Sequence, residues 1–259
     1  MKNKKVLRFF LSFIVLTFVS CSKDTDDGFK LLQKALETTA RGNTQTYLYA
    51  YNGSKIVSID GTQERTDFTY TDGLISKMVT LNKTNQLLET IEYSYFKGKL
   101  VSVSSVGNYK IKYTHNADKT VSFEKFTLGT GNVEVKEYHG TLHFTNDNLT
   151  KEERIYDNSL AGEESKYSIS FDYDNKRNPL FNIAGFKELL NQNDKISINN
   201  NVISTVITST SINGQITSSA TTYKNAFTYD LENYPKERVS ESTPLASGFV
   251  GYLKIEYFY

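Results

Sequence analysis

The sequence has no tryptophan, one cysteine and three prolines among 259 residues. A single cysteine excludes an internal disulfide, and so few prolines leave long stretches free to form uninterrupted strands. Neither sign of charge dominates, because 30 Lys and Arg stand against 29 Asp and Glu. Four of the basic residues fall within residues 1–20, which hold no acidic residue, so the rest of the chain has 26 basic and 29 acidic side chains. This balance argues against a nucleic-acid partner.

The only long hydrophobic run spans Phe9 to Val19 and follows a basic start, Lys2-Asn3-Lys4-Lys5. At about 11 residues it is shorter than the roughly 20 that a spanning helix needs. This pattern predicts a signal peptide over residues 1–20. Phe18-Val19-Ser20 before the lone Cys21 resembles a lipobox, which implies cleavage before Cys21 and acylation of Cys21. The alternative is an ordinary signal with an incidental cysteine.

The residues after Cys21 are polar and acidic, so we predict a flexible tether over 21–28. Their sequence resembles the export signal of Bacteroidetes lipoproteins that reach the outer face of the outer membrane. The expected location is therefore the outer membrane, with a lipid anchor (palmitate) on Cys21 and exposure at the cell surface. A solvated linker without an export role is the alternative.

A short unit recurs along the rest of the chain: two aromatic residues flank one residue, a polar turn follows, and an aliphatic strand leaves the turn. Asn52-Gly53 and Asp72-Gly73 are typical of tight hairpin turns. The first six copies start 18 to 31 residues apart, which suits a repeat of two strands. The copies begin at Tyr49, Phe68, Tyr93, Ile111, Leu142, Phe171 and Phe227.

Apolar and polar residues alternate within the predicted strands, as in Tyr109-Lys110-Ile111-Lys112-Tyr113. A period of two is typical of antiparallel strands with one packed face and one wet face. We predict an all-β antiparallel meander of about 14–16 strands, curled or partly closed like a barrel, as one domain over 29–259. Strands are also expected over 34–39, 44–47, 196–211, 216–229, 236–242 and 249–259.

One segment breaks the alternation. Asn178 suits a helix N-cap and Pro179 the first helical position. Leu180, Ile183 and Phe186 then follow at helical spacing. We predict one short helix near 180–190, about three turns long, covering an open end or face of the sheet. Because this insertion interrupts the repeat, residues 178–201 are the better place to look for function.

Three stretches, residues 49–59, 68–75 and 171–179, resemble a family of Bacteroidetes outer-membrane lipoproteins of unknown function with a porin-like antiparallel β fold. The resemblance covers nearly the whole chain after the signal. The repeats also loosely resemble the tyrosine–aspartate (YD) repeats of Rhs-type proteins. The resemblance implies a location and an architecture, and no catalytic residue.

Candidate chemical groups give no convincing site. Adjacent acids such as Glu152-Glu153 point to opposite faces of a strand, and a solvated face is the expected role of the acidic clusters. Asp172, Asp174 and Asn178 suggest a calcium loop, but counting from Asp172 the template fails at its Gly and Glu positions, which are Arg177 and Ile183. Turn and cap roles are therefore expected of these three residues. His139 and His143 lie in a predicted strand without a zinc motif. Gly129-Thr130-Gly131 reads as a hairpin turn. We therefore predict no catalytic residue, no metal and no cofactor.

The aromatic residues are expected to form cross-strand ladders in the core, with stacking on sugar rings as the alternative. A membrane-spanning barrel is disfavoured because many predicted strands are shorter than the roughly 9–11 residues needed to span. The function expected is a lipid-anchored, non-enzymatic binding or structural module whose ligand the sequence does not identify; a glycan and a surface protein are the candidate partners. The alternative is a glycan-active enzyme or accessory glycan-binding subunit of a polysaccharide utilisation system.

Overall fold

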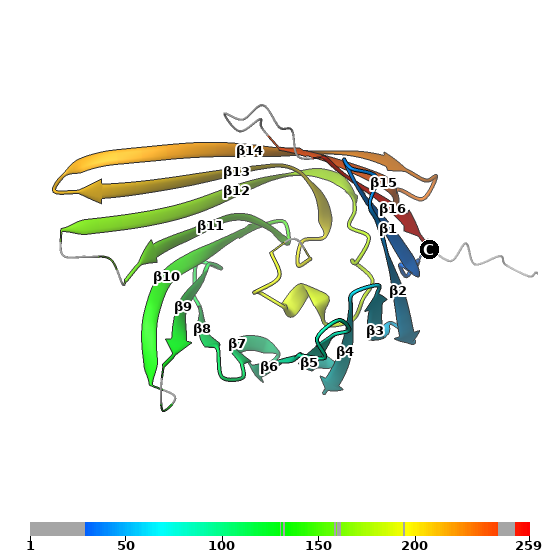
Figure 1. The fold of residues 1–259 in the computed structure, drawn as a ribbon, viewed down its shortest axis with the longest axis horizontal. Helices are drawn as coiled ribbons and strands as arrows, with labels where there is room; N and C mark the ends of the chain where they lie inside the picture. Colours follow the sequence, from blue (N-terminus) through cyan, green and yellow to red (C-terminus); the bar gives the residue numbers. More distant parts are fainter. Residues whose placement is uncertain are drawn as a thin grey trace, which may run out of the picture.

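The computed structural model describes residues 29–129, 131, 133–157, 159, 162–193, 195–242 and 252–259. The predicted signal peptide, Cys21 and the tether lie outside the described residues. Within them, sixteen antiparallel strands close into one barrel (Figure 1). Each strand pairs with its neighbours in sequence, and β1 pairs with β16 to close the ring. The predicted all-β antiparallel meander is therefore confirmed, and the barrel closes fully.

The first eight strands are mostly seven to nine residues long. They are β1 (Lys34–Thr39), β2 (Thr44–Asn52), β3 (Lys55–Gly61), β4 (Glu64–Thr71), β5 (Leu74–Asn82), β6 (Leu88–Phe96), β7 (Lys99–Ser105) and β8 (Tyr109–His115).

The second half of the barrel contains the longest strands, with β10, β12, β13 and β14 reaching 12 to 15 residues. These strands are β9 (Val121–Leu128), β10 (Glu134–Thr145), β11 (Asn148–Tyr156), β12 (Glu163–Arg177), β13 (Asn199–Ile212), β14 (Gln215–Tyr229), β15 (Pro235–Ser242) and β16 (Tyr252–Phe258).

In its three clearest copies, the recurring aromatic unit contains a β-bulge. In each copy the strand register shifts just before the second aromatic residue, at Tyr51, Tyr70 and Tyr95. The shift pairs these tyrosines with Ile56, Ile75 and Leu100, all of which are fully buried. A β-bulge of this kind redirects the side chains that follow it. Here it aims an aliphatic residue from the start of each returning strand into the lumen.

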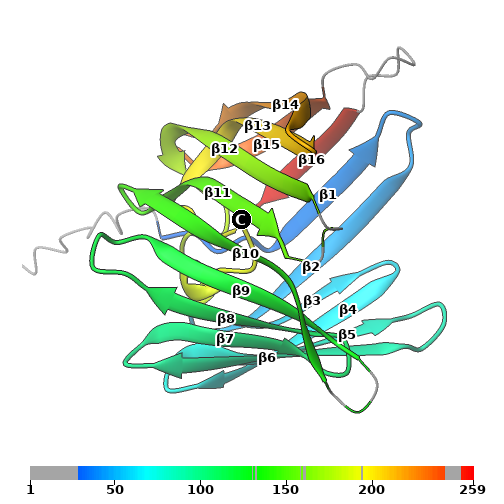
Figure 2. The same cartoon turned by 90° about the vertical axis from the view of Figure 1, so that its left-hand side faces the viewer.

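The predicted turn residues adopt the conformations that tight hairpins require. Asp72-Gly73 and Lys97-Gly98 both have positive φ at their two central residues, as a type I′ turn demands. Because the strands form a meander, successive turns alternate between the two rims of the barrel. These two turns share one rim with Tyr259, where β16 ends; we call it the terminal rim and the opposite one the far rim (Figure 2).

The segment between β12 and β13, described over residues 178–193 and 195–198, runs inside the ring of strands (Figure 1); we call it the floor segment. Its apolar residues Ile183, Phe186 and Leu189 join the main core cluster. They pack with wall residues from the first two positions of strands that begin at the terminal rim: Ile56, Ile75, Leu100, Val121 and Leu149. The floor segment therefore fills the terminal-rim half of the lumen.

The short helix expected near 180–190 is present as the 3₁₀ helix η2 (Phe186–Glu188), a single turn rather than three. Asn178 does cap the start of the segment, because its Oδ1 accepts a hydrogen bond from Leu180 N at 2.8 Å. Gly185, however, has φ +83°, which interrupts any continuous right-handed helix. Of the two predicted placements, an open end or a face of the sheet, the segment takes the second, because it packs on the inner face of the barrel wall. Within the described residues, no helix is long and apolar enough to cross a membrane.

Cross-strand aromatic ladders form part of the inner wall, as predicted. Tyr113, Phe123 and Tyr138 stand on successive strands, with ring centroids 6.2 Å and 6.1 Å apart. Tyr156 on β11 continues the ladder at 5.7 Å from Tyr138. Rings at these distances stabilise neighbouring strands beyond the burial of their area. The aromatic repeat is thus a wall element of the barrel.

Candidate functional site

The barrel wall separates an apolar inner face from a charged outer face. On β8, Ile111 and Tyr113 belong to the core. Their neighbours Lys110 and Lys112 both bind Glu134 on the outer face, at 3.2 Å and 2.6 Å. Similar outer ion pairs link Lys136 with Glu124, Lys254 with Glu237, and Lys83 with Asp60. The outer wall therefore presents many charges, held mostly in pairs.

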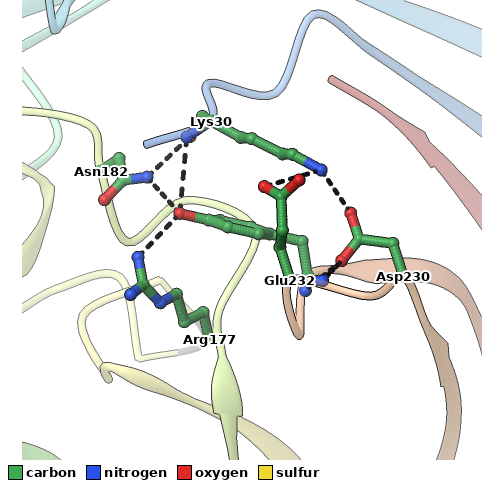
Figure 3. A network of polar contacts seen from close by, with 6 residues as sticks. Lys30, Arg177, Asn182, Asp230 and Glu232 are labelled. Atoms are coloured by element: carbon green, nitrogen blue, oxygen red, sulfur yellow. Dashed lines mark hydrogen bonds and ion pairs between the residues drawn. The ribbon is translucent and has the colours of Figure 1, made fainter. Parts of the chain in front are cut away.

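A hydroxyl-centred network fixes the floor segment where it enters from the terminal rim (Figure 3). The fully buried Tyr234, in the β14–β15 connection, accepts hydrogen bonds on its hydroxyl from Asn182 Nδ2 at 2.6 Å and Arg177 at 3.1 Å. Asn182 also donates to the Lys30 carbonyl at 2.8 Å, and the Lys30 ammonium binds Asp230 at 2.7 Å. This network joins the chain before β1, the end of β12, the floor and the β14–β15 turn. Sequence reasoning missed it, since its members are far apart in sequence.

A buried ion pair fixes the other end of the floor. Glu152 is 3% exposed, and its carboxylate accepts hydrogen bonds from Arg154 and from Asn193 of the floor. The guanidinium of Arg154 also lies over the rings of Tyr138 and Tyr167, at 5.0 Å and 4.7 Å. The expectation of a solvated face was therefore wrong for Glu152, while its neighbour Glu153 does lie at the surface beside Lys151. The two acids do point to opposite faces, as predicted.

Asp174, weighed as a calcium ligand, instead organises polar groups of the protein. Its carboxylate accepts hydrogen bonds from the Tyr229 hydroxyl, from Lys176 N and from Asn200. Asp172 is exposed on the same strand, so the two acids do not converge. Among the described residues, no three His, Cys, Asp or Glu side chains come together as a metal site.

The three histidines have separate roles. His139 and His143 both lie on the outer face of β10, where they contact Asp157 at 2.9 Å and Glu153 at 3.0 Å. The ring of His115 contacts the Leu100 carbonyl at 2.8 Å. Gly129 donates its N–H to the Val133 carbonyl, which closes the predicted β9–β10 hairpin. These residues form no common site.

Two adjoining cavities lie in the lumen above the floor. One of about 220 Å³ is bounded by the floor and the β13–β16 and β1 side of the wall, and one of about 300 Å³ by β1 to β5. They share the lining residues Glu37, Tyr49 and Lys195. The second also reaches Glu64, the exposed first residue of β4 at the far rim. The lumen is thus shaped as a cup, closed by the floor and accessible from the far rim.

The charged groups of the cup differ from those of the outer wall. Among the described residues, no ion pair or hydrogen bond engages the side chain of Glu37, Lys195 or Arg238, although all three line the 220 Å³ cavity. Arg238 Nε is buried without a hydrogen-bond partner in that part of the chain. Burial raises the pKa of Glu37, and the nearby Arg238 partly opposes this rise. Unpaired charges in a concave site are candidates for ligand contacts.

Comparisons with known proteins agree with the fold. No protein-family model and no curated protein sequence matches the chain. Solved structures do match: a porin-like protein from Bacteroides vulgatus superposes with a TM-score of 0.58 at 15% identity, over 89% of this chain and 99% of that chain. A porin-like protein from Bacteroides uniformis gives 0.52 at 10% identity, over 88% and 97%. At these identities the likeness shows the fold alone, and the chain has a porin-like β-barrel fold. Its lipoprotein character and its likeness to Rhs repeats stay predictions.

Proposed function

We propose that this protein is a lipid-anchored, cup-shaped binding module of the outer membrane, which takes a small ligand into its lumen without transforming it. The observation that carries the proposal is the pair of adjoining cavities above the floor, lined by charged groups that lack partners among the described residues. Together the cavities reach the size of about 300–1,000 Å³ that is usual for small-molecule sites. Acylation of Cys21 holds the cup at the membrane.

The outer wall supports anchoring in place of spanning. Lys112 stands in the middle of β8, and Lys254 with Glu237 lies on the outer face of the β15–β16 pair. Lys and Arg side chains on a lipid-facing wall cost about 2–4 kcal/mol each near the bilayer midplane, and Asp and Glu cost less. Strand length does not exclude a membrane-spanning barrel, because β10, β12, β13 and β14 are long enough to span. What argues against spanning is the charge of the outer wall, together with the apolar core that the floor forms in the terminal-rim half of the lumen.

A glycan-active enzyme remains the second candidate because two acids line one cavity. Glu37 and Glu64 both bound the 300 Å³ cavity, and both add to the rise in the pKa of Tyr47 that burial causes. The raised pKa of Glu37 suits a general acid. Hydrolysis of oligosaccharides that is abolished by both Glu37→Gln and Glu64→Gln would establish this alternative. Binding without product formation is the outcome expected here.

The experiment for lumen binding is a thermal-shift screen of small polar metabolites and glycans, followed by calorimetry. Ala35 is buried and lines the 220 Å³ cavity, so Ala35→Phe fills part of that cavity. Leu36, its neighbour on β1, pairs with Glu256 of the outer face, so Leu36→Phe is the matched control. We expect ligands that stabilise the wild type and Leu36→Phe but not Ala35→Phe. Equal stabilisation of all three proteins would refute lumen binding.

A further inference from the structure

Asn200 offers an unused acceptor at the 220 Å³ cavity. Its side chain is 2% exposed and lines the cavity. Its Nδ2 donates to the Arg177 carbonyl at 3.0 Å and to the Asp174 carboxylate at 3.2 Å, which fixes the orientation of the amide. Its Oδ1 is buried and has no hydrogen-bond partner among the described residues. Leaving such an atom unpaired is costly, so a ligand O–H or N–H is the natural partner.

Two cations line the same cavity. Arg238 reaches it from β15 and Lys195 from the floor, and Arg238 Nε is a second buried atom without a described partner. An arginine side chain presents a planar set of donors that matches a carboxylate. The lining also includes apolar residues such as Leu32 and Phe227, and Phe227 pairs with Arg238 across β14 and β15. The site therefore combines an anion-binding edge, a hydroxyl-binding acceptor and apolar lining residues.

We propose that this cavity binds a sugar acid, a hydroxylated ring that bears one carboxylate. The carboxylate meets Arg238 and Lys195, a ring hydroxyl donates to Asn200 Oδ1, and the less polar face of the ring lies against the apolar lining residues. The proposal rests on the proposed function, because it names the ligand class of the same lumen site.

The charges around the cavity favour a monoanion. Glu37 lines the cavity with the two cations, and the carboxylate of Asp174 stands directly behind Asn200. The lining itself has two cations and one acid, which leaves a surplus of one positive charge, and a phosphate dianion would meet stronger repulsion than a monoanion from Glu37 and Asp174. A neutral sugar, in turn, offers Arg238 Nε only a hydroxyl oxygen, which is a weaker acceptor for a guanidinium than a carboxylate.

Calorimetry on the mature protein with D-glucuronate, D-glucose and D-glucose 6-phosphate tests this ligand class. We expect glucuronate to bind at least tenfold more tightly than either of the other two. Arg238→Gln and Lys195→Gln should each weaken glucuronate binding at least tenfold. Lys254→Gln, which removes a cation from the outer face of neighbouring β16, should leave it unchanged. Circular dichroism confirms that each variant is folded, and Lys195→Gln keeps the test valid should Arg238→Gln fail to fold.

Equal binding of glucuronate and glucose, or full binding by both lumen variants, would overturn the sugar-acid proposal. The screen with Ala35→Phe then distinguishes an error in the ligand class from an error in the proposed function. Other ligands that require an unfilled lumen would leave the proposed function standing with a different ligand class. Failure of every compound to distinguish Ala35→Phe from the wild type would overturn both.

Discussion

The Tyr70 hydroxyl donates a hydrogen bond to the Ala184 carbonyl at 2.9 Å, which joins wall strand β4 to the floor segment across 114 residues of sequence. The same oxygen accepts the Ile56 N–H at 3.1 Å. Tyr70→Phe removes both bonds and leaves two backbone groups unpaired, so we expect a loss of about 1–3 kcal/mol in the free energy of unfolding. Urea denaturation measures it.

Tyr223→Phe is the control for that loss, since Tyr223 on β14 is 42% exposed. It should change stability by a few tenths of a kcal/mol at most, as surface substitutions usually do. Equal losses from the two variants would mean that the contact between β4 and the floor contributes nothing specific.

Gly185 tests how closely the floor approaches the wall. A Cβ at this position would lie 3.2 Å from both Ile75 N and Ile75 Cγ1, and its φ of +83° disfavours any side chain. Gly214, in the β13–β14 turn, has a similar φ of +85° but open space around it. Gly214→Ala should cost only the conformational term of about 1–2 kcal/mol, whereas Gly185→Ala should cost clearly more. Thermal and urea unfolding compare the two; equal costs would contradict the close packing.

Adjacent glutamates on β11 provide a test of the two wall faces. Glu152→Ala leaves the Arg154 guanidinium in the lumen without its carboxylate, which should cost about 3–5 kcal/mol. Glu153→Ala removes an exposed pair with Lys151 and should cost no more than about 1 kcal/mol. Chemical denaturation of both variants decides the point, and similar losses would show that Glu152 is not buried as described.

The raised pKa of Glu37 predicts a pH dependence of stability. Burial favours the protonated form in the folded protein, so folded Glu37 binds more protons than the unfolded chain, whose pKa is near 4.5. Stability then falls as pH rises through the window that starts near 4.5. Glu37→Gln in the ligand-free protein should therefore raise the melting temperature at pH 7–8, and this gain should vanish near pH 4.

Glu134 is the reference for Glu37, because its contribution to stability changes with pH in the opposite direction. Hydrogen bonds from Lys112 and Lys110 lower its pKa, so its ionised form stabilises the fold above pH 4.5, and this contribution is lost as pH falls through the lowered pKa. Glu134→Gln should lower the melting temperature at neutral pH and lose its effect in acid. If the change in melting temperature followed the same pH profile in both variants, the pKa of Glu37 would not be raised in the folded protein.

Local signals in the sequence were sufficient to predict the strands, the turns and the inward aromatic ladders. Alternation specifies a strand, and Asp72-Gly73 specifies a hairpin, because both depend on neighbouring residues. Closure of the ring depends on pairs such as Ala35 with Tyr257, which are distant in sequence. No local pattern marks that pairing, so the sequence left open whether the sheet closes.

The floor was recognised as an interruption but not as the base of a cup. Its apolar spacing favours a helix, yet Gly185 adopts a left-handed conformation and the apolar residues pack against a surrounding wall. Alternation also shows that Glu152 and Glu153 face opposite ways without showing which faces inward. The lumen site depends on which residues of β1, β13, β15 and the floor face inward. Alternation alone does not give that direction, so no ligand-binding residue could be named from sequence.

Our central proposal is that the barrel wall faces water and that acylation of Cys21 alone holds the protein at the membrane. Exchange of residues 1–21 for a signal that is cleaved without lipidation tests this directly, because no uncleaved apolar leader remains. Membrane fractionation of cells with the exchanged and natural leaders is the measurement. The account predicts that the exchanged protein moves to the soluble fraction and stays folded without detergent. Its retention in carbonate-washed outer membranes would contradict the account and identify a membrane-spanning barrel.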